Sequence, residues 1–243
     1  MPIVLYEYKP NRKAKNAEEF LEGFEGWLHA DGYRGYHKLN EKIRVVGCWA
    51  HARRKFEGAL KALPKKEQKS APAAVGTAYY TKLFMLEKEF AELTAEERAK
   101  KRREEAQPVL DALFAWANSM LPKTAPKSAL GRALHYLLKQ KPYLLRYLED
   151  GRLELSNNRA ERSIKPFVMG RKNWLFSNTP GGAQSSSVIF SLIETAKENG
   201  LDPYGYLLHI LRTAPKLSLI DPDWAAQFAP DTVPDFCRVP ISE

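Results

Sequence analysis

Two spacings of apolar residues alternate in the first quarter of the chain. Residues 2–8, 27–30 and 43–49 are rich in β-branched and aromatic side chains, a composition typical of strands. Residues 17–26 and 50–62 instead repeat apolar side chains every three to four positions, which predicts amphipathic helices. We therefore expect strands and helices to alternate here, and this alternation favours an α/β sheet.

A different pattern begins after a Lys- and Pro-rich linker at residues 63–71. From residue 77 to residue 150, apolar side chains recur at helical spacing and no strand pattern interrupts them. Thr94 and Glu97 form a capping-box pattern, which predicts the start of one of these helices. We interpret residues 63–150 as an all-helical insertion.

A short polar helix is predicted at residues 158–165. Ser156 or Asn157 can cap its start, because their side-chain oxygens accept hydrogen bonds from free backbone N–H groups. Pro166 is expected to end it, since proline lacks an N–H and crowds the preceding turn. Residues 167–169 are then expected to be extended.

Two apolar helices follow in the pattern, at residues 183–199 and from Pro203 to a point before Pro215. Residues 151–214 would thus return the chain to the sheet-containing part that residues 1–62 began. Residues 215–243 contain repeated proline breaks and predict an irregular tail that is loosely docked or mobile. The expected fold class is α/β, helix-rich, with a partial sheet.

Charge adds a class of partner to this picture. The net charge is +9, so a polyanion such as DNA is a candidate. Cys48 and Cys237 are too few for a disulfide framework, which favours a reducing compartment. No stretch reaches the roughly 18 uninterrupted apolar residues of a membrane span, and no signal peptide is recognisable. We expect a soluble cytoplasmic protein with no membrane partner.

The predicted polar helix is also a candidate site. Its positions i, i+3, i+4 and i+7 share one face. A carboxylate on that face lies among amide and cationic donors, and Arg171 and Lys172 follow, so the face can hold a divalent cation beside a phosphate backbone. A solvated helix with i,i+4 ion pairs is the alternative. The four residues of the face are Asn158, Glu161, Arg162 and Lys165.

Two further candidates follow predicted strands. Asp31 ends the second strand just before Gly32, and in open α/β sheets sites gather at the carboxyl ends of strands. A plain Asp-Gly turn is the alternative. Cys48 and His51 follow the third strand, but a zinc site needs four ligands and no second pair of suitable spacing exists. A packed, buried thiol is therefore the better interpretation of Cys48.

Five segments carry a family resemblance. They are residues 31–33, 47–56, 153–162, 170–176 and 191–196, which include the motifs Cys-Trp-Ala-His and Leu-Ser-Asn-Asn-Arg-Ala-Glu-Arg. In this order they resemble the catalytic domain of the insertion-sequence sixty-six family of bacterial transposases. The likeness extends over most of the chain ahead of the predicted tail.

The resemblance implies a DDE-type enzyme, with an RNase-H-like sheet and three carboxylates that hold two Mg²⁺ ions. A helical insertion separates the second acid from the third in that family. By this likeness Asp31 is the second catalytic and metal-binding acid and Glu161 the third. Cys48 and His51 match a Cys-x-x-His element that braces the site.

The same resemblance implies DNA at the ends of an insertion element as the substrate. Trp174 and Phe176 are better interpreted as core residues, with stacking of an unpaired base as the alternative. A homo-oligomer assembled on DNA is expected. The residues expected to hold the DNA backbone are Asn158, Arg162, Lys165, Arg171 and Lys172.

The first acid of the family has no counterpart among these residues. It would precede the strand that resembles residues 2–8, and Glu7 is on the wrong strand to replace it. We expect a truncated or split transposase gene whose product is nearly inactive alone, with full-length transposase or an upstream-encoded fragment as a partner. The alternatives are a non-catalytic DNA-binding remnant, with salt-sensitive binding independent of Asp31, and a structural helical protein that retains no DNA.

Overall fold

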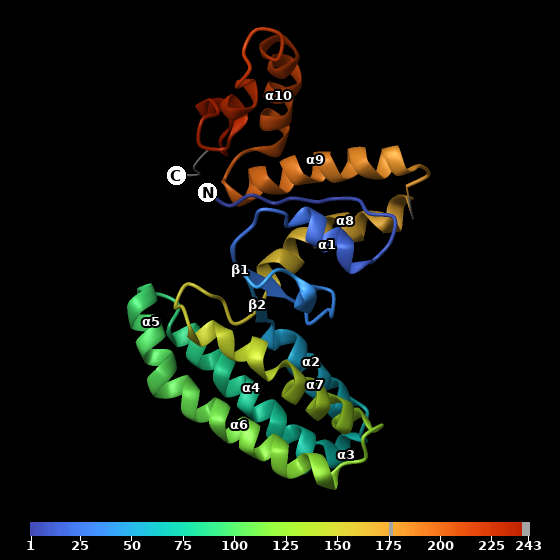
Figure 1. Ribbon diagram of the computed structural model, residues 1–243, viewed down its shortest axis with the longest axis vertical. Coiled ribbons are helices and arrows are strands. Elements are labelled where there is room, and N and C mark those ends of the chain that lie inside the picture. Colours follow the sequence, from blue (N-terminus) through green and yellow to red (C-terminus); the bar gives the residue numbers. More distant parts are fainter. Residues whose placement is uncertain (175–176, 240–243) are drawn as a thin grey trace. The chain divides into compact units, whose positions relative to one another are not determined.

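A computed structural model gives the structure of residues 1–174 and 177–239, and helices make up most of it (Figure 1). Contacts divide the chain into two compact units. The first, the helical unit, is Lys13–Arg159. The second, the terminal unit, joins Met1–Arg12 to Ala160–Glu243. Three side chains inside a helix lie outside the described part, those of residues 171, 172 and 174.

The sheet of the helical unit has two strands among the described residues, β1 (Gly26–Ala30) and β2 (Ile43–Gly47). They pair in parallel, and their last residues lie opposite each other. Both strands confirm the sequence pattern, as does the helix after β2. Because the carboxyl ends meet at one edge, Asp31 and Cys48 leave the sheet at that edge.

The long helices of the helical unit extend away from this sheet (Figure 1). The capping box of Thr94 and Glu97 is present, as predicted. Residues 63–71, predicted to be a linker, contain a short helix. A π-helical segment, Arg102–Ala106, joins two of the helices. The helices are α1 (Ala14–Phe20), α2 (Trp49–Lys61), α3 (Lys65–Gln68), α4 (Pro72–Glu89), α5 (Ala95–Lys101), α6 (Gln107–Met120) and α7 (Ala129–Leu144).

One apolar core joins β2 and α2 to the long helices. Trp49, the first residue of α2, is fully buried, and its ring centroid lies 6.0 Å from that of Tyr80 and 6.2 Å from those of Phe114 and Tyr147. Its indole N–H donates to the backbone oxygen of Leu144 at 2.9 Å. The start of α2, which leads out of the sheet edge, is therefore fixed by packing from three helical segments.

The terminal unit contains most of α8 (Asn158–Trp174), together with α9 (Pro180–Glu198) and α10 (Pro203–Leu217). Pro166 was predicted to end α8 and the residues after it to be extended; both predictions are wrong, since the helix continues. Phe167 packs edge-on against Phe190 with centroids 5.3 Å apart, and this tertiary contact offsets the hydrogen bond that proline removes.

Residues 2–8 are extended but form no strand, contrary to the prediction. The backbone N–H of Val4 donates to Thr195 Oγ1 at 2.9 Å, and that of Tyr6 donates to Ser191 Oγ at 2.8 Å. Side chains of α9 therefore satisfy this segment in place of a neighbouring strand. Strand composition predicted the extended backbone but not the partner.

The tail after α10 is packed rather than loosely docked, which corrects the prediction for its described part. Phe228, Val233 and Cys237 are buried, and the hydroxyl of Tyr206 donates to the backbone oxygen of Phe228 at 2.7 Å. Apolar side chains between the proline breaks supply a small core that the proline pattern concealed. Among the described residues, no helix is both long enough and apolar enough to cross a lipid bilayer.

Candidate functional site

Asp31 lies in a tight turn directly after β1. Its Oδ1 accepts a hydrogen bond from the backbone N–H of Tyr33 at 2.9 Å, and Gly32 between them has a φ of 86°, a conformation that favours glycine. The hydroxyl of Tyr136 on α7 donates to the backbone oxygen of Asp31 at 3.0 Å. The turn is thus held from two sides, while the carboxylate itself is exposed.

Helix α7 approaches this turn so closely that only glycine fits. A Cβ added to Gly32 would lie 2.6 Å from the hydroxyl oxygen of Tyr136 and 3.3 Å from Oε1 of Gln140. Gln140 is 4% exposed, and its Oε1 has no hydrogen-bond partner among the described residues. An acceptor oxygen is therefore buried against the turn that carries Asp31. Sequence reasoning missed both side chains, although a glutamine inside an apolar stripe was an available signal.

Cys48 follows β2 and precedes the first turn of α2. It is buried, and its Sγ accepts a hydrogen bond from the backbone N–H of Asn157 at 3.4 Å. The backbone N–H of Trp49 donates to the oxygen of Leu155 at 3.1 Å. These contacts fasten the segment ahead of α8 to the sheet edge, which supports a bracing role for Cys48. His51, one turn into α2, is half-buried.

The polar face predicted around residues 158–165 lies on one continuous helix, α8, as expected. Arg162 and Lys165 are exposed and Glu161 is half-buried. Asn158 is its first residue and belongs to the helical unit, whereas the other three belong to the terminal unit. The remaining predicted DNA contacts fall outside the described residues or side chains: Arg171, Lys172, Trp174 and Phe176.

Electrostatics near Asp31 are set by buried phenols and exposed cations. Burial, together with the nearby Cys48 and Asp31, raises the pKa of Tyr136 to about 12, and Arg54 opposes this shift. The hydroxyl therefore stays protonated near neutral pH and keeps donating to the turn. Lys55 Nζ lies 4.6 Å from the centroid of the Tyr136 ring, so the cations of α2 begin beside the turn.

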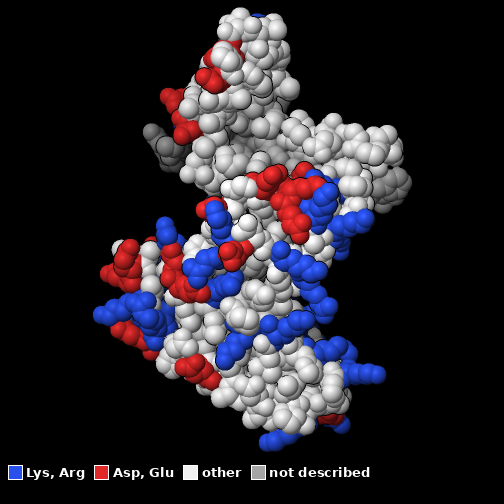
Figure 2. Space-filling model, in the orientation of Figure 1, with Lys and Arg blue, Asp and Glu red and all other residues white. Residues whose placement is uncertain are grey.

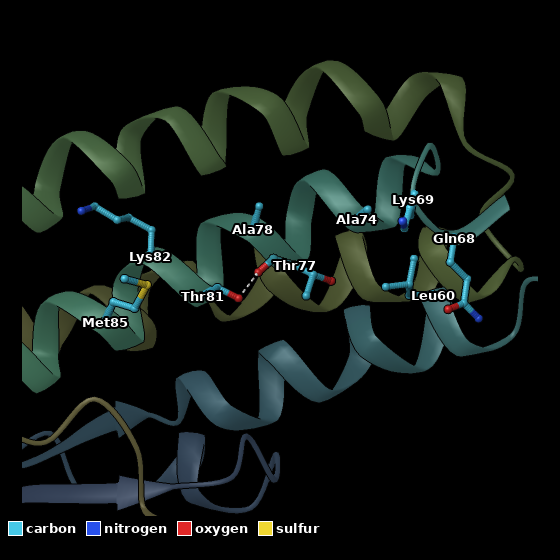
Figure 3. Close-up of a pocket in the computed structure, with 9 residues that line it drawn as sticks. All are labelled: Leu60, Gln68, Lys69, Ala74, Thr77, Ala78, Thr81, Lys82 and Met85. Atoms are coloured by element: carbon cyan, nitrogen blue, oxygen red, sulfur yellow. Dashed lines mark hydrogen bonds between the residues drawn. The ribbon is translucent and has the colours of Figure 1, made fainter. Parts of the chain in front are cut away.

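The helical unit also contains a hollow, but its lining offers no chemistry comparable with that of the Asp31 carboxylate. It has a volume of about 640 Å³ and is lined by α4 with parts of α2 and α3. Figure 3 shows Lys69 and Lys82 toward its two ends, with small side chains between them. The hydroxyl of Thr81 donates to the backbone oxygen of Thr77 at 3.1 Å. Because no carboxylate or histidine lines this hollow, the turn of Asp31 is the stronger candidate.

Comparison with known proteins identifies the family. A family model described as "Transposase IS66 family" matches residues 1–185, and one described as "IS66 C-terminal element" matches residues 191–221. The chain belongs to the IS66 family of transposases. This confirms the family predicted from the motifs.

Relatives of this IS66-family chain include three uncharacterized proteins of Sinorhizobium fredii. The one called y4qI is 34% identical over 219 residues, which is 86% of this chain and 40% of that protein. Those called y4jD and y4hP are 33% and 29% identical and are covered to 42% and 40%. The chain thus spans about two fifths of the length of these curated relatives. No solved structure matches it.

The IS66 family match includes both predicted acids. Asp31 belongs to the helical unit and Glu161 to the terminal unit. The expectation that both carboxylates bind one pair of ions stays a prediction, because they belong to different compact units.

Proposed function

We propose that this chain supplies part of the catalytic domain of an IS66-family transposase, with Asp31 and Glu161 as metal-binding acids. The reaction would be cleavage and transfer of DNA strands at the ends of an insertion element. In this proposal β1 and β2 belong to an RNase-H-like sheet. The carrying observation is the turn of Asp31: an exposed carboxylate, held at the carboxyl edge of a parallel sheet, within the family match.

The residues at this turn fit a hard divalent cation. A carboxylate has about four lone-pair sites, and the Oδ1 of Asp31 uses one of them for the N–H of Tyr33. Mg²⁺ prefers oxygen ligands and keeps several waters, which suits an exposed carboxylate. When bound, a pair of such ions stabilises the attacking and leaving oxygens of a phosphodiester displacement.

The chain's own residues would position the acids and the DNA. Tyr136 and Gly32 fix the backbone of Asp31, and Cys48 fixes the segment that leads into α8, where Glu161 lies. Cations on α8 would contact phosphates, which position DNA without reading its sequence. These cations are Arg162, Lys165, Arg171 and Lys172, and the neutral side chain of Asn158 would contact the DNA backbone with them.

The family likeness implies a third acid that none of the matched motifs supplies. Two carboxylates leave a pair of ions under-ligated, so we propose that the chain by itself cleaves DNA weakly or not at all. A nicking assay with Mg²⁺ or Mn²⁺ tests this directly. Robust turnover that Glu161→Gln abolishes would show that the chain is active without a third acid.

Terbium luminescence tests Asp31 as a ligand. Tb³⁺ occupies Mg²⁺ and Ca²⁺ sites with oxygen ligands, and the phenols of Tyr33 and Tyr136 beside the turn can sensitise its emission. We expect sensitised emission that Mg²⁺ displaces, and a loss of affinity in Asp31→Asn larger than the roughly 10- to 100-fold cost of altering an outer-sphere group. The matched control is Asp231→Asn, which removes an exposed carboxylate in the tail. Equal affinity in both variants would exclude Asp31 as a ligand.

A non-catalytic DNA-binding protein is the second candidate, and the net charge of +9 favours it. It predicts DNA binding that falls steeply with salt and does not change in Asp31→Ala. It also predicts no metal-dependent nicking that requires Asp31, even when a separate fragment that carries only the family's first acid is added. Restored nicking that requires Asp31 would favour the catalytic proposal instead.

A further inference from the structure

Positive charge is concentrated in the helical unit around α7. Residues 112–148 contain six Lys and Arg residues and no Asp or Glu. Helix α2, which packs along α7, adds four cations and a single acid, Glu57. Figure 2 shows Lys and Arg side chains gathered on the side of α2 and α7, whereas Asp and Glu side chains are mixed with them over α5.

Five exposed cations define a surface called the basic face. On α2, the first and last cations of this face are Arg54 and Lys61, seven residues apart. On α7, Arg132 and Lys139 are also seven residues apart, so each helix presents its cations on one side. The α7 cations flank Tyr136, which lies on the same side. The residues of the basic face are Arg54, Lys55, Lys61, Arg132 and Lys139.

Most of these charges are not neutralised within the protein. Among the described residues, no salt bridge involves Lys55, Lys61, Arg132 or Lys139. The charged surface of α5 differs, because Lys101 there forms a salt bridge with a glutamate at 2.7 Å. Arg53, on another side of α2, also forms a salt bridge with a glutamate at 2.7 Å. A row of unpaired like charges is unfavourable by itself, and an external anion relieves it.

The basic face lies beside the turn of Asp31. Lys55 lies over the ring of Tyr136, whose hydroxyl donates a hydrogen bond to the Asp31 backbone. One turn after Lys139 on α7, Tyr143 stacks on His37, with centroids 4.0 Å apart and planes 8° apart. A strand that follows these cations would therefore pass directly beside the candidate carboxylate.

We infer that the basic face binds the sugar-phosphate backbone of double-stranded DNA without metal. Arg132 to Lys139 span about 10 Å along α7 at 1.5 Å per residue, which matches about three base pairs at 3.4 Å each. Protein partners are usually anchored by exposed apolar side chains. None of the large exposed apolar residues among the described ones lies on α2 or α7.

This inference deepens the proposed function, because it names a second DNA-contacting surface besides the cations of α8. It takes DNA as the polyanion from the family, but it does not depend on metal binding by Asp31. The two proposals therefore succeed or fail separately. DNA binding measured in EDTA reports on the basic face, and terbium binding reports on the carboxylate.

The test is fluorescence anisotropy of the full chain with a labelled 30-base-pair duplex in EDTA, over a series of salt concentrations. One variant combines Lys55→Gln, Lys61→Gln and Lys139→Gln. The slope of log affinity against log salt should become less steep by about 2.7, since each phosphate contact contributes roughly 0.9. The control combines Lys88→Gln, Lys100→Gln and Arg103→Gln, which removes the same charge from exposed positions elsewhere in the unit and should keep the original slope.

Circular dichroism melts first establish that both triple variants fold like the parent. Equal loss of slope in the two variants would overturn the inference, because net charge alone would explain binding. An unchanged slope in the basic-face variant would also overturn it. The inference would also be overturned if polyglutamate competed for binding as well as duplex DNA of equal charge does, since the face would then suit an acidic protein.

Discussion

The two compact units are stabilised in different ways. In the helical unit, one continuous cluster of buried side chains runs from β2 through the long helices, with Trp49, Tyr80 and Leu134 fully buried. The cluster of the terminal unit is small and centres on Tyr206 and Cys237. Since burial of apolar area is the main stabilising term, the helical unit has the larger reserve of stability.

Apolar side chains left on the surface show the same contrast. In the terminal unit, several lie on α8 and α9 and are between 40% and 51% exposed: Ile164, Val168, Met169, Val188 and Ile189. Polar contacts replace part of the missing core there, such as those of Ser191 and Thr195 to the extended N-terminal segment. The comparison teaches that a few hydrogen bonds matter more in the terminal unit than in the helical unit.

The helical unit nevertheless contains one polar centre of its own. Arg102 is fully buried, and its guanidinium forms two hydrogen bonds with the carboxylate of Glu87, at 2.7 and 2.8 Å. It also donates to the backbone oxygens of Tyr147, Asp150 and Leu153. This side chain connects the π-helical segment to the stretch of chain that leads toward Cys48 and α8.

The largest expected effect is that of Arg102→Ala. It leaves Glu87 without its partner and three buried carbonyls without donors, so the free energy of unfolding of the helical unit should fall by about 3–5 kcal/mol. Urea unfolding followed by amide signals from each unit measures this. The neighbouring Arg103→Ala removes an exposed cation and should change stability by less than about 0.5 kcal/mol. If the terminal unit lost as much stability as the helical unit, the proposed contrast between them would fail.

Sequence pattern predicted the elements whose causes are local. The capping box of Thr94 and Glu97 depends on two residues that are three positions apart. The Asp31–Gly32 turn was predictable for the same reason. Each of these features is written in neighbouring residues, so periodicity and capping rules were sufficient.

Features that depend on distant residues were not predictable. We predicted that α8 ends at Pro166 because proline removes a backbone hydrogen bond. The packing of Phe167 on Phe190, which favours a continued helix, cannot be read from neighbouring residues. The contact of Tyr136 with the turn of Asp31 joins residues 105 positions apart. A single sequence does not record such contacts. Asp31 was therefore predicted as a site residue, while the residues that hold its turn were missed.

A smaller effect is expected for Tyr206→Phe in the terminal unit. The variant removes the hydrogen bond to the backbone oxygen of Phe228 and keeps the ring, which should cost about 1 kcal/mol. Because this unit has a small core, hydrogen exchange in the tail should accelerate while that of the helical unit stays constant. Tyr204→Phe, at a position 74% exposed, is the control. Equal acceleration in both variants would show that the buried hydroxyl contributes nothing.

The smallest effects separate the units by pH. In the helical unit, hydrogen bonds from Arg152 lower the pKa of Asp150 from 3.8 to about 2. In the terminal unit, burial, together with the charge of Glu194, raises the pKa of Tyr6 from 10.0 to about 12. An acid whose pKa is lower in the folded state stabilises the fold at pH values above the pKa that it has in the unfolded chain. That contribution is lost as pH falls from about 4 toward 2. A raised phenol pKa works in the opposite window, since its contribution is complete below pH 10 and lost as pH rises toward 12.

Acid between about pH 4 and 2 should therefore weaken the helical unit, and alkali between about pH 10 and 12 should weaken the terminal unit. The acid effect is small because Arg152 is exposed and its ion pair is screened by solvent. NMR titration of the Asp150 carboxyl carbon and the Tyr6 ring, together with unit-resolved unfolding at both pH limits, measures the two effects. Arg152→Gln should return the Asp150 pKa toward its ordinary value, and Glu194→Gln should reduce that of Tyr6. A titration in which Arg152→Gln left the Asp150 pKa unchanged would assign the acid sensitivity of the helical unit to other carboxylates.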